Sequence, residues 1–262
     1  MCAADLACYA AKDMGRGRVH VYESGDRELA RRHGEMQWVS RLTEAINNDR
    51  LVLYYQDIVP VVPEAGAGHH FEFLVRMLDE NNEPVLPGMF MPAAEKYNLA
   101  PALDRWVISR SFAWYKDAGR YRPAAECQKM SINLSGASLA EASILDFIKT
   151  ELNSNQIPPG VVCFEITETA AVTNLDIAIE FIKELRQLGC SFALDDFGTG
   201  LSSFAYLKNL PVDYLKIDGS FVRDIETNPV NRAMVKSIHQ VGHVMGLETI
   251  AEFVENDAIR KV

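Results

Sequence analysis

Short apolar runs alternate with longer amphipathic stretches along most of this chain. The runs are rich in Val, Ile, Leu and Phe, and we expect them to be strands, at 51–61, 70–78, 129–134, 161–167, 190–195, 212–217 and 247–253. The clearest helix between them is expected at 174–188, with an apolar face of Ile177, Phe181, Leu185 and Leu188 before Gly189. Repeated strand–helix alternation predicts an α/β fold with a parallel sheet and helices outside it.

Two segments precede this pattern. Residues 1–25 offer one helix-like stretch and one alternating run, which is too little to form a core, so we expect the end of another domain. Residues 26–50 have apolar side chains at helical spacing, which predicts a helix with a narrow apolar stripe. This helix either packs on the domain formed by residues 51–262 or pairs with its copy in a dimer as a signalling linker, and we favour the first.

Composition narrows the classes of protein that the chain can represent. The 262 residues carry a formal net charge of −10, which argues against binding to a nucleic-acid polymer. No apolar run is long enough to span a bilayer, and the N-terminus lacks the cationic leader of a signal peptide. The five cysteines are odd in number and show no C-x-x-C spacing, which favours a reducing, cytoplasmic compartment.

Charged and amide residues fall in or directly after the expected strands. A carboxylate at the end of a buried strand is costly unless it is paired or binds a metal ion. Because this happens in one strand after another, we expect a metal site at the mouth of an α/β barrel. Oxygen ligands without Cys or His favour Mg²⁺ or Mn²⁺ over structural zinc. The charged and amide residues that fall in or directly after the expected strands are Glu72, Asn133, Glu165, Asp195, Asp196, Lys216 and Glu252.

Asp196 directly follows Asp195 and suits a second metal ion. Successive residues of a strand point to opposite faces, so both carboxylates reach one site only if the chain turns there. We expect Gly198 and Gly200 to supply that turn. Two ions can clamp an in-line displacement at phosphorus, and cations are needed between an acidic site and an anionic substrate. The alternative is that Asp196 caps the loop.

Two cationic residues accompany the carboxylates. Lys216 at a strand end can hold a water molecule or offset negative charge in a transition state, and a salt bridge to a ligand carboxylate is the compatible alternative. Arg76 shares a strand face with Glu72 and can bind a phosphate, or form a salt bridge. His239 and His243 are interpreted as surface or packing residues on a helix.

These residues stand in motifs that resemble the EAL-domain cyclic-di-GMP phosphodiesterases. The order and spacing of the motifs fit that family from about Leu51 to the end of the chain. The motifs are Glu72-Phe73-Leu74 with Arg76, Asn133-Leu134-Ser135, Glu165-Ile166-Thr167-Glu168, Asp195-Asp196-Phe197-Gly198-Thr199-Gly200, Lys216-Ile217-Asp218 and Ala251-Glu252-Phe253-Val254-Glu255.

The resemblance implies a modified TIM-type (β/α) barrel whose first strand is antiparallel. It implies hydrolysis of cyclic di-GMP to linear pGpG with about two Mg²⁺ or Mn²⁺ ions per site. The implied metal ligands are Glu72, Asn133, Glu165, Asp195, Asp196 and Glu252. The implied catalytic residues are Glu72, Lys216, Glu252 and Asp195. The implied substrate contacts are Gln56, Arg76 and Leu74, and Glu168 is implied to support the 195–203 loop.

The resemblance also extends to partners. Ala4-Asp5, Tyr9, Ala11-Lys12 and Gly15-Arg16 resemble the last helix and strand of a GGDEF domain, which implies such a domain upstream in the same chain. Family members often dimerise near the 195–203 loop, so a homodimer is expected. Seven strands are one fewer than a closed barrel needs, and we expect the last strand and helix to lie beyond Val262. The alternative function is an inactive cyclic-di-GMP receptor or a dimeric signalling platform.

Three residues depart from the family pattern. Phe73 replaces an Ala, and its side chain is expected to point away from the pocket with little effect. Asp57 replaces a Pro next to Gln56, which can alter how a guanine is held. Phe253 replaces a Gly beside Glu252, where it either crowds the base of the site or packs against an eighth strand.

Overall fold

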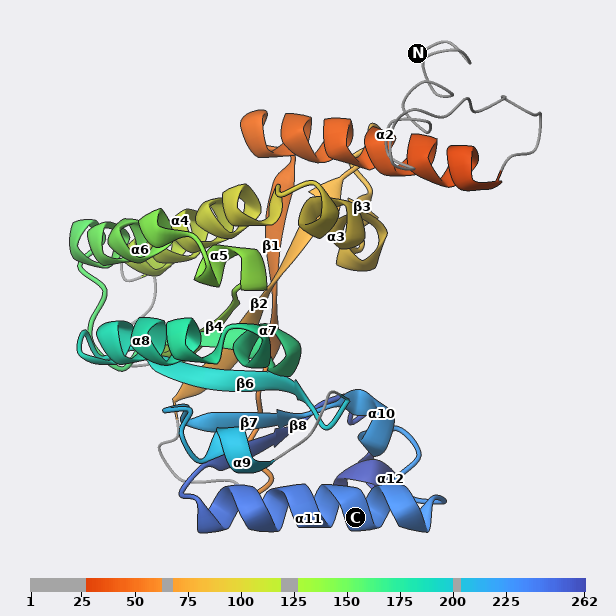
Figure 1. Ribbon diagram of the computed structural model, residues 1–262, viewed down its shortest axis with the longest axis vertical. Coiled ribbons are helices and arrows are strands. Elements are labelled where there is room, and N and C mark those ends of the chain that lie inside the picture. The colour runs from red at the N-terminus through yellow and green to blue at the C-terminus, as the bar shows by residue number, and fades with distance from the viewer. Residues whose placement is uncertain (1–26, 63–67, 119–126, 200–203) are drawn as a thin grey trace. The chain divides into compact units, whose positions relative to one another are not determined.

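The structure, a computed structural model, describes residues 27–62, 68–118, 127–199 and 204–262. The features expected in residues 1–25, including the GGDEF-like remnant, lie outside these ranges. The strands are β1 (Leu51–Asp57), β2 (His69–Leu78), β3 (Pro84–Val85), β4 (Cys127–Asn133), β5 (Val162–Thr167), β6 (Ser191–Phe197), β7 (Tyr214–Ile217) and β8 (Glu248–Ala251) (Figure 1).

The longer helices lie mainly between these strands in the sequence, as the alternating pattern predicts. They are α2 (Arg27–Asn47), α3 (Pro87–Lys96), α4 (Ala100–Ala118), α6 (Ala142–Ser154), α8 (Leu175–Arg186) and α11 (Pro229–Val244). The shorter ones are α5 (Gly136–Leu139), α7 (Glu168–Thr173), α9 (Phe204–Leu207), α10 (Gly219–Val222) and α12 (Asp257–Arg260). Among the described helices, none is both long enough and apolar enough to cross a bilayer.

All seven expected strands are present, and they form one sheet in the order β1-β2-β4-β5-β6-β7-β8. From β2 onward the neighbours in this order are parallel. Ile58 N donates to His70 O and Leu78 N donates to Arg50 O, a pattern that makes β1 antiparallel to β2. The described residues contain one strand that was not expected, β3, because a two-residue pairing with β2 has no periodic signal in the sequence.

The chain divides into two compact units, residues 1–52 with 76–99 and residues 53–75 with 100–262. In the smaller unit α2 packs against α3. Leu42 of α2 and Phe90 of α3 are fully buried there, and Lys96 Nζ lies 2.6 Å from Glu35 Oε2. The apolar stripe of α2 is therefore used, at least in part, for packing within the same chain. Whether α2 also pairs with its copy stays a prediction, as do the domain boundaries.

The larger unit buries β5 and β6 beneath helices. Phe164 and Phe192 are fully buried and point toward the covering helices. The Phe181 ring of α8 lies 6.3 Å from the Phe192 ring between centroids. Figure 1 shows α8 along β6, and α11 packs against β7 and β8. Because both faces of these strands are covered, their sequences read as continuous apolar runs rather than as alternation.

Helix α8 begins and ends close to the expected bounds, but its buried face is shifted. Its buried side chains are Ala178, Phe181, Ile182 and Leu185, whereas Ile177 is 46% exposed and Leu188 is 41% exposed. Leu188 falls outside the expected face because the helix ends at Arg186, two residues earlier. Gly189 has a φ of +87°, as a left-handed C-cap requires.

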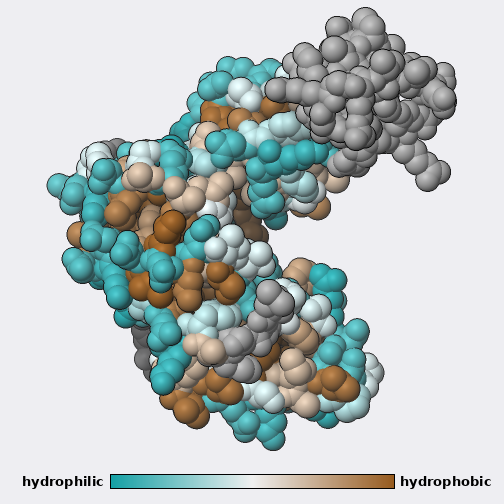
Figure 2. Space-filling view, viewed as in Figure 1, coloured by the Kyte–Doolittle hydropathy of each residue, from teal (hydrophilic) through white to brown (hydrophobic). Residues whose placement is uncertain are grey.

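Apolar side chains also reach the surface of the larger unit. Figure 2 shows hydrophobic and hydrophilic side chains interspersed on the viewed face. On α11 the exposed apolar side chains are Val230, Met234 and Val244. Scattered exposure of this kind is common on the surfaces of folded proteins. His239 lies on the same helix and its Nδ1 is 2.8 Å from Thr249 Oγ1, so it takes part in a helix–strand contact as expected.

Candidate active site

The expected site residues come together in the larger unit. Every second side chain of a strand points to the same face of the sheet. The site residues point to the face that lies opposite the covering helices. Asn133 ends β4, Glu165 and Asp195 lie on β5 and β6, and Glu252 directly follows β8. Glu72 lies in the middle of β2 rather than at its end, because β2 continues to Leu78. We refer to Glu72, Asn133, Glu165, Asp195, Lys216 and Glu252 as the site layer.

Lys216, on β7, is at the centre of the site layer and only 2% exposed. Four carboxylates surround its ammonium group. The Nζ atom lies 2.5 Å from Glu165 Oε2 and 3.0 Å from Glu252 Oε1. It also lies 3.1 Å from Asp195 Oδ2 and 3.3 Å from Glu72 Oε2. The salt-bridge interpretation of Lys216 is therefore confirmed, and it leaves the catalytic role open because the two are compatible.

Negative charge exceeds positive charge in this cluster. Burial, followed by repulsion from Glu72 and Asp195, raises the pKa of Glu165 to about 7 against the opposing effect of Lys216. Burial likewise raises the pKa of Glu252 to about 7. Burial by itself lowers the pKa of Lys216, but the surrounding carboxylates more than compensate, and its net pKa is raised. The lysine stays charged and does not neutralise its partners fully.

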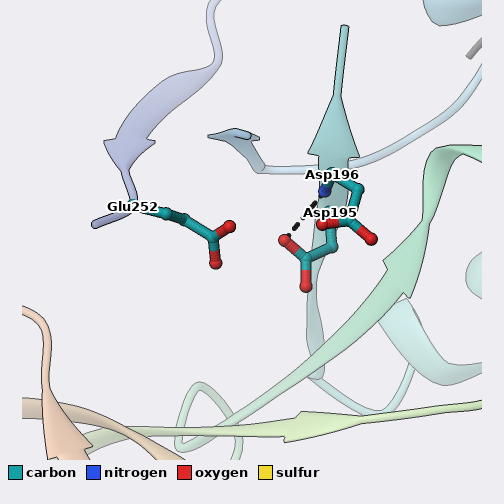
Figure 3. Close-up of side chains that lie close together, drawn as sticks. All are labelled: Asp195, Asp196 and Glu252. Carbon is teal, nitrogen blue, oxygen red and sulfur yellow. Dashed lines mark hydrogen bonds between the residues drawn. The ribbon is translucent and has the colours of Figure 1, made fainter. Parts of the chain in front are cut away.

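The donor set fits a divalent cation. Asp195, Asp196 and Glu252 each offer a carboxylate oxygen within 4.8 Å of the others. Figure 3 shows Glu252 extending toward the two aspartates. Glu165 Oε1 is buried and has no hydrogen-bond partner among the described residues, so it is an acceptor still available to a cation. Carboxylate oxygens suit Mg²⁺ or Mn²⁺.

Asn133 and Glu72, two further expected ligands, are joined by a hydrogen bond. Asn133 Nδ2 donates to Glu72 Oε1 at 2.6 Å, and Asn133 is exposed at the edge of the cluster. Four of the six expected ligands thus contact Lys216 directly. Asn133 joins them through Glu72, and Asp196 lies beside Asp195 and Glu252.

The chain turns at Asp196 itself, before the glycines at which the turn was expected. Asp196 itself has a φ of +54°, and the pairing of β6 with β7 shifts register between Leu194 and Phe197. This bulge, rather than the glycines alone, turns Asp196 toward the site. Asp196 N donates to Asp195 Oδ1 at 2.9 Å. Burial and the nearby Asp195 and Asp218 carboxylates raise the pKa of Asp196.

Gly198 has a separate structural role, and Gly200 lies outside the described residues. Gly198 has a φ of +107°, which mainly glycine adopts, and a Cβ atom at this position would lie 2.6 Å from the Phe221 ring. Its N–H donates to Glu168 Oε2 at 3.0 Å. Glu168 begins α7 and is 2% exposed. Glu168 therefore contacts the chain directly after β6. Its role in supporting the 195–203 loop stays a prediction.

The expected substrate contacts lie on the first two strands. Gln56 is exposed on β1, and Leu74 is half-buried on β2 and shares the strand face of Glu72 by alternation. Arg76 lies farther along β2, in the part of the strand that belongs to the smaller unit. Asp57, which replaces a Pro, has its Oδ1 atom 3.2 Å from His69 Nδ1. The roles of these residues toward a substrate stay predictions.

The two aromatic departures are both accommodated by packing. Phe73 points away from the site, as expected, and its ring lies 5.1 Å from Phe71 and 5.4 Å from Trp114 between centroids. Phe253 makes a contact that the sequence did not indicate. Its ring packs on Gly219, where a Cβ atom would lie 2.0 Å from Cδ2, and under Arg223 at 3.9 Å.

Sequence reasoning also missed the layer of side chains beneath the site. It comprises the residues two positions before the site-layer residues, and we call it the lower layer: His70, Ser131, Cys163, Ala193, Tyr214 and Ile250. Cys163, Ala193 and Tyr214 form a buried cluster with Ile250 packed against it. His70 Nε2 lies 3.2 Å from Ser131 Oγ. The period-2 spacing from the charged residues was the signal that locates this layer.

The chain is similar in sequence to a known family of proteins. The sequence matches the family model for the EAL domain over residues 39–262. It is 41% identical over 256 residues to "Cyclic di-GMP phosphodiesterase PdeB" of Shewanella oneidensis, covering 98% of this chain and 29% of that protein. It is 35% identical over 220 residues to "Cyclic di-GMP phosphodiesterase PdeA" of Borreliella burgdorferi, covering 84% of this chain and 32% of that protein. The chain thus spans about a third of the length of these relatives.

The chain is also similar in fold to solved structures. The PaMucR phosphodiesterase in complex with c-di-GMP superposes with a TM-score of 0.78 at 29% identity, covering 86% of this chain and 90% of that chain. The FimX EAL domain of Pseudomonas aeruginosa bound to c-di-GMP gives 0.76 at 29% identity, covering 85% and 87%. The family match covers most of the chain and includes every site-layer residue, so the chain belongs to the EAL domain family.

Proposed function

We propose that this barrel hydrolyses one phosphodiester bond of cyclic di-GMP to give linear pGpG in a metal-dependent reaction. One observation carries the proposal: four carboxylates crowd a single buried lysine, while Asp195, Asp196 and Glu252 converge within 4.8 Å. A site with this excess of negative charge binds an anionic phosphodiester only with cations between them. The relatives named as cyclic di-GMP phosphodiesterases support the choice of substrate.

Mg²⁺ or Mn²⁺, about two ions per site, is the proposed cofactor. Bound ions of this kind lower the pKa of water and stabilise negative charge on phosphoryl oxygens. The residues proposed to hold them are Glu72, Asn133, Glu165, Asp195, Asp196 and Glu252.

The other residues act on water and substrate. Lys216 donates hydrogen bonds from a fixed position, so it can orient a water molecule and offset charge on the phosphoryl group in the transition state. Gln56 is proposed to meet a guanine edge, Leu74 to line the pocket and Arg76 to bind a phosphate. Glu168 is proposed to support the segment that follows β6.

We also propose the context of this segment in the cell. Residues 1–25 are the end of a GGDEF domain in the same chain, the barrel forms a homodimer, and this segment lies in the cytoplasm. Cys163 and Cys190 are free and buried, which suits a reducing compartment. An inactive receptor or signalling platform is the weaker alternative, because such domains typically lose metal ligands and this site layer retains its carboxylates.

Product analysis tests the proposal directly. Cyclic di-GMP is incubated with the protein and Mg²⁺ or Mn²⁺, with an EDTA control, and linear pGpG is quantified by chromatography. Glu252→Gln keeps the side-chain shape and removes one charge, and the exposed Glu248→Gln on β8 is the matched control.

We expect metal-dependent pGpG that is lost in Glu252→Gln and kept in Glu248→Gln. Binding of cyclic di-GMP that persists without metal and survives Glu72→Ala, with no product from the unsubstituted protein, would instead establish the receptor.

A further inference from the structure

Glu168 has one carboxylate oxygen in use and one without a partner. Its Oε2 atom accepts the Gly198 N–H at 3.0 Å, and its Oε1 atom is buried and has no hydrogen-bond partner among the described residues. Leaving a buried carboxylate oxygen without a donor is costly, because the group has lost its hydration without gaining a partner. A donor is therefore required at Oε1.

Tyr206, on α9, carries a buried hydroxyl that also lacks a formed hydrogen bond among the described residues. Burial, followed by the neighbouring Glu168 carboxylate, raises the pKa of the Tyr206 hydroxyl. The phenol and the Glu168 carboxylate are therefore neighbours, and both the Tyr206 hydroxyl and Glu168 Oε1 are buried without a hydrogen-bond partner among the described residues. A neutral hydroxyl is a donor, and the free oxygen of Glu168 is an acceptor.

We propose that Tyr206 donates a hydrogen bond to Glu168 Oε1, so that one carboxylate binds both Gly198 and Tyr206. Tyr206 is then a positioning residue for Asp195 and Asp196. The inference rests on the proposed function in one respect, namely that these aspartates hold a metal ion.

The local backbone explains why such a tie is needed. Asp196 adopts a positive φ inside a bulge, where the sheet pairing between β6 and β7 is interrupted. A non-glycine residue persists in this conformation only when the surrounding structure fixes it. Gly198 follows Asp196 by two residues, so the bond from its N–H to Glu168 fixes the chain close to the turn. Glu168 in turn is fixed if its second oxygen is bound.

Tyr206→Phe is the first test, because it removes the hydroxyl and keeps the ring. Mn²⁺ binding to the folded, metal-free protein is measured by titration calorimetry, alongside kcat and KM for cyclic di-GMP. We expect metal affinity and kcat to fall about tenfold with little change in KM, as for other groups that orient metal ligands. Tyr97→Phe, which removes a hydroxyl 3.2 Å from Glu35 in the smaller unit, is the matched control and leaves both unchanged.

Glu168 variants show whether Tyr206 acts through that carboxylate. Glu168→Met removes both oxygens, and in that background Tyr206→Phe is expected to have no further effect on metal affinity. Glu168→Gln can still accept from Gly198 while its amide donates to Tyr206, so its metal affinity is expected within about threefold of the unsubstituted protein. This variant remains informative if Tyr206→Phe does not fold, since a tenfold loss in it would overturn the proposal.

Two further outcomes decide between explanations. Unchanged metal affinity and kcat in folded Tyr206→Phe, or a full additional loss in the Glu168→Met background, would overturn the positioning role. If the unsubstituted protein binds no Mn²⁺, the proposed function fails. The Tyr206–Glu168 contact is then judged by urea unfolding of the metal-free variants, in which a non-additive double substitution supports the contact and an additive one refutes it.

Discussion

The site layer and the lower layer are built on the same strands, yet they differ in what they leave unsatisfied. In the lower layer the polar side chains pair with one another, and burial lowers the pKa of His70 to about 4, so it is neutral at pH 7. Lys129 meets this layer through a hydrogen bond to Tyr214 at 2.6 Å and also donates to Ser191 at 3.1 Å. In the site layer one lysine faces four carboxylates.

The two layers are only two residues apart along each strand. That spacing separates the proposed metal site from a layer of ordinary packed side chains. Both layers have the same backbone and the same helices behind them. The lower layer is complete without a ligand, and its substitutions should change stability alone. The site layer is incomplete without cations, and its substitutions should change stability and metal binding in different directions. The predictions that follow test this separation.

Replacing Lys216 by Met should have the largest effect. The substitution leaves Glu165 and Asp195 buried without their cation, and breaking a buried pair costs about 3–5 kcal/mol. Turnover should fall by about a hundredfold or more, because the positioned donor is lost. Urea unfolding followed by circular dichroism, with and without Mg²⁺, measures the free energy of unfolding.

Lys149→Met is the matched control for Lys216→Met. Lys149 forms a partly exposed pair with Glu184 at 2.8 Å, and its loss should change the free energy of unfolding by about 1 kcal/mol or less. Equal effects of the two substitutions would remove the distinction between the site layer and an ordinary surface ion pair.

Metal binding should depend on pH near neutrality. Glu165 and Glu252 have pKa values of about 7 without metal, well above that of an exposed glutamate, so both bind protons more tightly in the folded protein. Their contribution to metal-free stability is therefore fully present below about pH 4.5 and is lost as the pH rises through 7. Metal requires the ionised forms, so Mn²⁺ affinity should rise about tenfold from pH 6 to pH 8.

Calorimetry in two buffers with different ionisation enthalpies checks this expectation through proton release on binding. Release of protons at pH 6.5 that disappears at pH 8.5 is expected. A Mn²⁺ affinity that is constant from pH 6 to pH 8 would show that the site-layer glutamates are already ionised.

In the lower layer, Tyr214→Phe should change stability but not chemistry. It removes the hydroxyl that accepts from Lys129 and leaves that ammonium with Ser191, at a cost of about 1 kcal/mol. Because Tyr214 lies two residues before Lys216 without sharing its carboxylates, turnover should stay within about threefold. Thermal unfolding and steady-state kinetics measure both effects, and a tenfold loss of turnover at full folding would join the two layers into one site.

The parts of this molecule that sequence could predict are those that depend on local pattern. Alternating segments located the seven strands, and carboxylates in or after buried runs located the site layer, because each signal lies within a few residues. Strand β3, the buried face of α8 and the position of Phe253 depend on contacts between distant segments, which no local pattern contains. The turn at Asp196 was assigned to glycines because a positive φ at an aspartate is set by its surroundings.

Phe253→Gly, just beyond the site layer, should have the smallest effect. Phe253 has a φ of +52°, which glycine adopts without strain, but its ring also covers Gly219 and stacks with Arg223. Relief of strain, worth about 1–3 kcal/mol, opposes the loss of a half-exposed contact, so the free energy of unfolding should change by about 1 kcal/mol or less. Since the ring packs on α10 rather than on Glu252, turnover should change less than about threefold. A large gain in turnover measured by pGpG production would mean that Phe253 restricts access to the carboxylates, and the boundary of the site would then include it.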